Sequence, residues 1–299
     1  MADRGCDRCG PAPASLRSLR PFFPYFLLVP GVVLVALLGF GLIDLFWKSI
    51  HSFDPFTREQ GPISLAQYRR LLAGSDGAYY RAILGRTLLI SALVTLGSTA
   101  VGLAVSYYLV RLPRRSSRVI ALSVILMPFL VGEVVRAFGW LLLLGRHGAL
   151  AWATSLGGGG GISLVGTRLG IWTGMMQVMI PIAVLVMLPT VRRIDPDLER
   201  AAMTLGARPR HVWGRIVLPL ARSGLAAAGV VVFSLSMTEF AIPQVLGLGR
   251  QPFVANLIHS MYFLQNNVYF GSAFAMILVS VVTLGVAVIG ATGRLGGAR

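Results

Sequence analysis

The sequence predicts an all-α membrane protein with six transmembrane helices, both termini in the cytoplasm and a cytoplasmic helical segment between the fourth and fifth helices. Three observations support this fold class. Of the 299 residues, 55% are hydrophobic and only 13% are charged, and the mean hydropathy of +0.74 exceeds that of soluble proteins. Several apolar runs reach the length of about 20 residues that a helix needs to cross a bilayer. Basic residues gather between these runs.

Six apolar runs are long enough to span a membrane. Arg17 and Arg20 precede the first run, as in a signal peptide, but the run is too long and lacks a persuasive cleavage site, so we expect it to be retained. The spans are expected at residues 22–46, 84–110, 119–144, 169–191, 225–248 and 273–291. This division predicts a cytoplasmic tail at 1–21, a transmembrane domain at 22–292 and a second cytoplasmic tail at 293–299.

Arginines are concentrated in alternate connections, which sets the orientation. Four lie at 111–118 in the second connection and seven lie at 192–222 in the fourth, whereas the third and fifth hold only Arg146, Arg168 and Arg250. The positive-inside rule therefore places both termini and the fourth connection in the cytoplasm. The net charge of +16 is spread over short connections rather than one solvated face, so we expect anionic lipids as partners and no nucleic acid.

The motifs of enzymes and cofactor sites are missing. The single lysine, Lys48, follows Phe46 and Trp47, so the chain has no GxxxxGK[ST] loop for ATP, and no HExxH or GxSxG occurs. Cys6 and Cys9 could be half of a zinc site, but with no second CxxC or nearby histidine we assign them no role. The five glycines at 157–161 are interpreted as a flexible external connection. We expect no enzyme activity, metal or cofactor.

The fourth connection contains the polar stretch LERAAMTLGARPRHVWGRIVLPL at residues 198–220. Asp195 is suited to cap a helix that starts there, Gly206 can turn left-handed and end it, and Pro209 fits the first turn of a second helix. Pro219 is expected to disturb the backbone at the entry to the fifth span. The first helix has one apolar face, formed by Leu198, Ala201, Ala202 and Leu205. A helix pair lying on the membrane surface would show a similar pattern.

Residue spacing in this stretch resembles the EAA signature of the inner-membrane permease subunits of binding-protein-dependent ABC importers. The matching residues are Ala201, Ala202, Gly206, Ile216, Leu218 and Pro219. The resemblance implies that segment 195–220 holds a coupling helix seated in a cleft of the ATPase subunit. It also implies two ATPase subunits, a second permease subunit, identical or homologous, and a periplasmic binding protein as partners. The motif's glutamate aligns with Arg200, so Glu199 is the only nearby acid and the usual ion pair with the ATPase is in question.

The resemblance covers most of the chain. SLAQYRRLL and RTLLIS look like the family's first external loop and second span, although Arg86 replaces the usual asparagine. MPFLVGEVVRAFGWLLLLGRHG, SMTEFAIPQVLG, VANLI and YFGSAFAMIL are similar to the spermidine/putrescine branch. That similarity implies a polyamine as the first choice of substrate, while related importers of iron, thiamine and phosphonates share parts of these stretches.

Ionisable groups inside a membrane are costly and therefore mark candidate substrate pathways. A rise of about 1.5 Å per residue along straight spans puts Glu133 and Glu239 about 21 Å, and Arg136 about 25 Å, above the cytoplasmic ends. Gln177 is expected at a comparable depth. Glu133 and Arg136 could instead neutralise each other as a buried pair that holds helices together. Trp47, Trp140 and Trp172 are interpreted as interfacial anchors.

The sequence thus predicts a multi-pass permease subunit of the bacterial inner membrane. A stand-alone secondary transporter is the main alternative; it would predict inverted repeats with paired broken helices, and no convincing internal repeat is visible. A membrane scaffold that transports nothing would leave the motif spacing unexplained.

Overall fold

A computed structural model describes residues 23–53, 60–74, 76–156 and 161–295. The predictions for the tail at 1–21, including Cys6 and Cys9, and for residues 157–160 of the glycine run lie outside the described residues. The same holds for residues 296–299 of the C-terminal tail.

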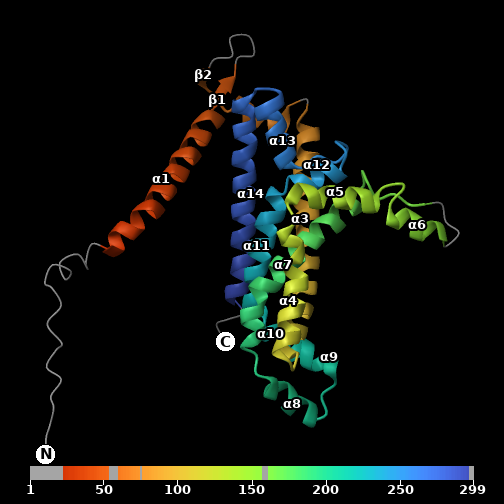
Figure 1. Cartoon of the computed structure of the whole chain (residues 1–299). Helices are drawn as coiled ribbons and strands as arrows, with labels where there is room; N and C mark the ends of the chain where they lie inside the picture. Colours follow the sequence, from red (N-terminus) through yellow and green to blue (C-terminus); the bar gives the residue numbers. More distant parts are fainter. Residues whose placement is uncertain (1–22, 54–59, 75, 157–160, 296–299) are drawn as a thin grey trace, which may run out of the picture.

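The described residues form helices and one small antiparallel hairpin (Figure 1). In chain order the first half consists of α1 (Phe23–Ser49), β1 (His51–Phe53), β2 (Gln60–Ile63), α2 (Ala66–Ala73), α3 (Gly77–Arg111), α4 (Arg115–Leu130), α5 (Glu133–Leu144) and α6 (Ala149–Leu156). The second half consists of α7 (Arg168–Arg192), α8 (Pro196–Thr204), α9 (Pro209–Val212), a π-helical turn η2 (Trp213–Val217), α10 (Leu218–Leu220), α11 (Arg222–Thr238), α12 (Ala241–Leu246), α13 (Val254–His259), a second π-helical turn η3 (Ser260–Leu264) and α14 (Val268–Leu295). The hairpin, in which His51 pairs with Ile63, departs from the all-α prediction.

Four helices are long and apolar enough to cross a membrane unbroken: Leu28–Ser49, Gly77–Arg111, Arg168–Arg192 and Val268–Ala291. They correspond to the predicted first, second, fourth and sixth spans. The number rises to six if each of two bent helix pairs counts as one span. The bent pairs contain the predicted third and fifth spans.

The predicted third span is broken. The chain turns by 96° between Arg115–Leu130 and Glu133–Leu156, because Val131 and Gly132 are extended, with ψ of 130° and 145°. Pro128, which lacks a backbone N–H, lies in the last turn of α4 just before the break. The apolar run continues through the bend, so hydropathy did not reveal it.

The predicted fifth span is also interrupted, towards its C-terminal end. α11 ends at Thr238, Glu239 is extended with ψ of 129°, and α12 begins two residues later. The straight rise assumed for Arg136 was therefore wrong, because Arg136 lies in α5 beyond the break. α4 and α11 are unbroken up to Leu130 and Thr238, so the depths expected for Glu133 and Glu239, just beyond these ends, stay predictions.

The core of the bundle lies where α3 packs along α7, and α11 contacts both. Ser98, Gly102 and Ser106 follow one face of α3 at intervals of four residues. A Cβ at Gly102 would lie 2.7 Å from the Cβ of Ala183, and the Ser106 hydroxyl donates to the carbonyl of Val184 at 3.2 Å. Such small residues allow helix backbones in a membrane to approach closely, which fixes α3 against α7.

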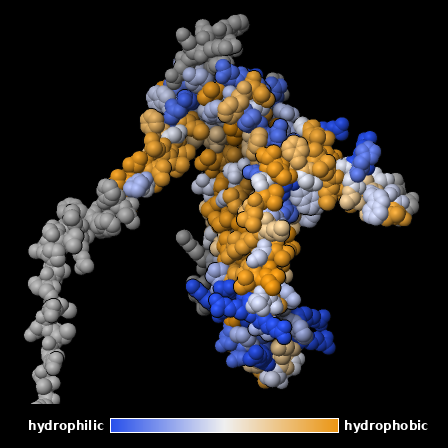
Figure 2. All heavy atoms as spheres, in the orientation of Figure 1, coloured by the Kyte–Doolittle hydropathy of each residue, from blue (hydrophilic) through white to orange (hydrophobic). Residues whose placement is uncertain are grey.

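Helix α1 leaves the bundle near the β-hairpin and diverges from it (Figure 1). It contacts α14, yet none of the residues in its apolar window is buried. The hairpin and α13 lie at one end of the molecule, and α8 and α9 lie at the other (Figure 1). Figure 2 shows hydrophilic residues gathered at both ends and a largely hydrophobic surface between them.

Candidate functional site

The helical corner in the fourth connection has the predicted geometry. An Asp195 carboxylate oxygen accepts the backbone N–H of Asp197 at 2.9 Å and caps α8. Gly206 has φ of +83°, and Ala207 donates to the carbonyl of Ala202 at 3.0 Å, which closes the C-terminus of α8. Pro209 occupies the first turn of α9. The cap, the left-handed glycine and the second helix start are therefore confirmed.

The predicted apolar face of α8 is largely exposed to solvent. Leu198 is 50% exposed and Leu205, directly after the helix, is 88% exposed. Ala201 is also exposed and Ala202 is half-buried. An amphipathic helix usually buries its apolar side in its own protein, so this face is free to bind something else.

The remaining motif residues lie beside the same corner. Ile216 is half-buried and lines a hollow of about 280 Å³ together with Ala202, Leu205 and Gly206. Leu218 is 43% exposed and Pro219 is half-buried. The chain bends by 67° between Pro209–Leu220 and Arg222–Thr238, as Pro219 led us to expect.

Glu199 and Arg200 have different partners. The carboxylate of Glu199 is buried, accepts the Tyr107 hydroxyl at 2.5 Å and forms an ion pair with Arg111. Arg200 pairs with Asp197 at 2.8 Å, and both of these side chains are more than 70% exposed. No local pattern predicted the role of Tyr107 or Arg111, because they lie about ninety residues before Glu199.

The intramembrane charges meet where the two broken spans face each other. Glu239 interacts electrostatically with Glu133 and Arg136 and accepts the backbone N–H of Ile242 at 3.4 Å. Arg136 donates to the carbonyl of Pro128 at 3.2 Å. Glu133 and Arg136 do not form an ion pair within 4 Å in the described part of the chain. The expected pairing within α5 is therefore replaced by a three-residue cluster.

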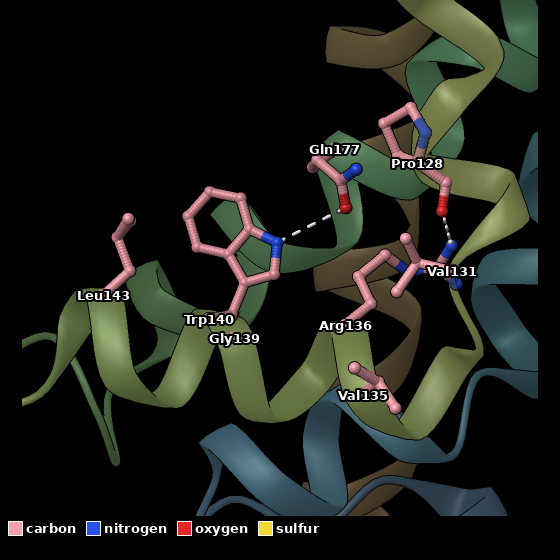
Figure 3. A pocket seen from close by; sticks show the side chains of 8 residues that line it. All are labelled: Pro128, Val131, Val135, Arg136, Gly139, Trp140, Leu143 and Gln177. Atoms are coloured by element: carbon pink, nitrogen blue, oxygen red, sulfur yellow. Dashed lines mark hydrogen bonds between the residues drawn. The ribbon is translucent and has the colours of Figure 1, made fainter.

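A pocket of about 430 Å³ opens beside this cluster (Figure 3). Arg136, Gln177 and Trp140 point into it, and the Trp140 indole N–H donates to the side-chain oxygen of Gln177 at 3.3 Å (Figure 3). The structure thus brings Arg136 and Gln177 together as expected, while Glu133 and Glu239 do not line the pocket. Trp140 was interpreted as an interfacial anchor; its contact with Gln177 depends on α5 turning sideways, which the sequence pattern does not reveal.

No three His, Cys, Asp or Glu side chains converge to hold a metal ion in the described residues. The chemistry that this arrangement offers is non-covalent. At one end of the molecule an apolar helix face is available for docking, and in the half of the bundle away from α8 a charged cluster adjoins a pocket.

Residues 94–294 match the protein family described as the binding-protein-dependent transport system inner membrane component. The chain belongs to this family. The match covers more than half of the chain, and it identifies a permease subunit of an ABC importer, located in the inner membrane. The helical corner at Gly206 lies within the matched residues.

Several relatives are permeases of such importers. The inner membrane ABC transporter permease YdcU of Escherichia coli is 29% identical over 280 residues, which cover 88% of each chain. The spermidine/putrescine permease PotB of Haemophilus influenzae is 24% identical over 264 residues, covering 87% of this permease and 86% of PotB. The molybdenum permease ModB of Mycobacterium bovis is 31% identical over 182 residues, covering 60% of this permease and 65% of ModB.

Solved structures agree on the fold. A chain of a bacterial ABC transporter that imports the acidic polysaccharide alginate superposes with a TM-score of 0.75 at 14% identity, covering 96% of this permease and 100% of that chain. A second structure shows a bacterial alginate ABC transporter in complex with a periplasmic protein that holds an alginate pentasaccharide. Its matching chain gives a TM-score of 0.73 at 14% identity, and the superposition covers 94% of this permease and 98% of that chain.

Proposed function

We propose that this permease pairs with itself or a homologous permease, docks two ATPase subunits through segment 195–220 and receives its substrate from a periplasmic binding protein. One observation supports the ATPase contact above all others. The apolar face of α8, with Leu198 and Leu205, is largely exposed to solvent. A partner cleft would cover this face, and the chain lacks a phosphate-binding loop of its own.

The distribution of charge supports six spans with both termini and α8 in the cytoplasm. Arg111 in the second connection contacts Glu199 in the fourth, so the two arginine-rich connections lie at the same end of the molecule. Figure 2 shows the hydrophilic surface over α8 and α9 at that end. The positive-inside rule then favours a cytoplasmic location for this end, where its arginines would lie close to anionic lipid headgroups.

The exposed surface of helix α1 supports the proposal of a second permease subunit. Leu34, Val35 and Phe40 on α1 are each at least 67% exposed, and the helix diverges from its own bundle (Figure 1). Lipid or a neighbouring permease would cover these side chains. Only a neighbouring permease would also complete a transport pathway between two subunits.

We propose a polyamine as substrate. Two carboxylates, Glu133 and Glu239, share the outer cluster with a single guanidinium, Arg136, so the cluster holds one more acid than base and favours a cation. The relative PotB is named for spermidine and putrescine. Iron, thiamine and phosphonate remain alternatives, and Arg136 in the pocket would suit an anionic substrate.

The coupling mechanism follows from these contacts. ATP-driven closure of the ATPase subunits would displace α8, and the bundle would switch between outward-facing and inward-facing arrangements. The broken helices α4–α5 and α11–α12 were expected of a secondary transporter. The family match over residues 94–294 favours the ATP-driven importer.

Co-expression with ATPase and binding-protein genes of the same genome tests the proposal. We expect the ATPase to co-purify with this permease and reconstituted vesicles to take up spermidine only with ATP and loaded binding protein. Uptake that needs no ATPase would support the secondary transporter instead. Uptake of phosphonate, thiamine or iron in place of spermidine would support the proposal of an importer but contradict the proposal of a polyamine substrate.

A further inference from the structure

Glu199 is the only buried Asp or Glu among the described residues, with 6% of its surface exposed. One carboxylate oxygen accepts the Tyr107 hydroxyl at 2.5 Å, and the other is paired with the guanidinium of Arg111. Both partners belong to the last two turns of α3. The acid in the coupling segment is therefore used within the permease, because a side chain in this position cannot reach a docked subunit.

Aromatic contacts extend this junction to the other side of the corner. The Arg111 guanidinium lies over the Tyr107 ring at 5.2 Å from its centroid, and the Tyr107 ring meets Trp213 of η2 edge to face at 5.1 Å. Arg111 also donates to the carbonyl of Ile194, between α7 and α8, at 3.4 Å. One charged and aromatic cluster thus joins α3 to both helical parts of the coupling segment.

We propose that Glu199, Arg111 and Tyr107 form a clamp that attaches the coupling helix α8 to the inner end of α3. This assignment rests on the proposed docking of an ATPase to α8. Glu199 is then a positioning residue for coupling and not a residue that binds the ATPase. Docking is left to the exposed Leu198 and Leu205.

The clamp lies at the start of a continuous packed route to the outer pocket. α3 runs from Arg111 towards the outer end, and its Ser98–Gly102–Ser106 face is seated closely on α7. α7 in turn carries Gln177, which lines the pocket with Arg136. The clamp therefore gives a displacement of α8 a direct route to α3, through the contacts of Glu199 with Tyr107 and Arg111.

The first experiment compares each clamp residue with an exposed neighbour of the same type. The variants Glu199→Gln and Tyr107→Phe remove clamp contacts. Asp197→Asn, with an exposed carboxylate, and Tyr108→Phe, 65% exposed, are the controls. In vesicles containing the whole importer, we expect the clamp variants to retain bound ATPase while substrate transported per ATP hydrolysed falls by roughly tenfold. The controls should keep the wild-type ratio.

Charge reversal then tests whether the pair itself matters. Glu199→Arg and Arg111→Glu should each uncouple transport, and the double variant should recover much of the wild-type ratio, because it restores an ion pair between the same two positions. A purely structural role would lower the amount of folded importer without changing the ratio per assembled complex.

Amide hydrogen exchange, measured on the permease alone, tests the clamp without any ATPase. The α8 amides of Glu199→Gln should exchange at least about tenfold faster than in wild type, because the opened clamp frees the helix to unfold locally, whereas those of Asp197→Asn should not. Unchanged exchange and an unchanged transport ratio in Glu199→Gln would overturn the proposal. Loss of ATPase binding with unchanged exchange would also overturn it, by making Glu199 a docking residue. If wild type captures no ATPase, the proposed function fails while the exchange result still decides the clamp.

Discussion

Glu199 and Arg200 are neighbours in the sequence, yet their side chains lie in opposite environments. The side chain of Glu199 is 8% exposed and is held by α3, whereas that of Arg200 is 73% exposed. Successive helical residues point about 100° apart, so α8 can turn one charge inward and the other outward. The position at which the family motif has its glutamate therefore presents a cation to solvent, and the acid beside it does not substitute for that glutamate.

The corner at Gly206 is expected to be essential for coupling. Valine at φ of +83° would cost on the order of 1–2 kcal/mol, which misplaces α8 but does not prevent membrane insertion. We expect normal expression of Gly206→Val, with stimulated ATP hydrolysis and uptake falling together in reconstituted vesicles.

Gly214 provides the control for this variant. A Cβ at either Gly206 or Gly214 meets no atom within 4 Å, but only Gly206 has a positive φ. Gly214→Val should therefore retain coupling. Full coupled uptake by Gly206→Val would mean that the left-handed corner is not needed and would leave segment 195–220 as a surface helix pair.

The exposed face of α8 should govern ATPase binding. Leu205 is 88% exposed, so Leu205→Asp should barely change the stability of the permease alone. If Leu205 inserts into a cleft of the ATPase, its replacement by a charge should weaken the complex at least about tenfold. Co-purification at graded ATPase concentrations measures this, with Leu65→Asp near the opposite end as control. Equal capture by both variants would contradict docking through this face.

The outer cluster should report the charge of the substrate. Glu239→Gln keeps the shape of the side chain but removes its charge, so spermidine uptake should fall several-fold while assembly and basal ATP hydrolysis persist. Arg136→Gln removes the single cation of the cluster and should spare spermidine uptake relative to Glu239→Gln. The reverse order, with Arg136→Gln the more damaging, would indicate an anionic substrate.

The pocket beside the cluster should affect apparent substrate affinity. Trp140→Phe removes the donor to Gln177, a hydrogen bond that contributes about 0.5–1.5 kcal/mol. We expect the KM for uptake to rise with little change in thermal stability. Trp152, on α6 and 66% exposed, supplies the control Trp152→Phe. Unchanged uptake kinetics in Trp140→Phe would exclude this pocket from the substrate route.

Close packing of α3 on α7 should limit the stability of the bundle. Alanine at Gly102 would place its Cβ 2.7 Å from that of Ala183, and overpacking of this kind typically costs about 1–3 kcal/mol. Gly102→Ala should therefore melt at a lower temperature than wild type in lipid nanodiscs. Gly85→Ala on the same helix, where a Cβ meets no atom within 4 Å, should keep the melting temperature of the wild type. Equal melting temperatures would show that the interface adjusts.

Much of the fold could be predicted because it depends on local properties. The unbroken helices α1, α3, α7 and α14 follow from the length of their apolar runs, since a bilayer requires that length whatever the neighbouring helices do. The cap at Asp195 and the left-handed Gly206 follow from backbone preferences within a few residues. The absence of a phosphate-binding loop follows from the single lysine.

Long-range contacts decided the rest. Hydropathy measures composition and not direction, so the breaks after Leu130 and Thr238 were invisible in continuous apolar runs, and so was the sideways course of α5, which carries Arg136. The inward turn of Glu199 depends on Arg111 and Tyr107, which become its neighbours only when α3 packs beside α8. The sequence by itself determined which segments are apolar, where α8 is capped and where it ends, because these depend on nearby residues. Only the tertiary structure decided which side chains face inward, because that depends on partners far away in the chain.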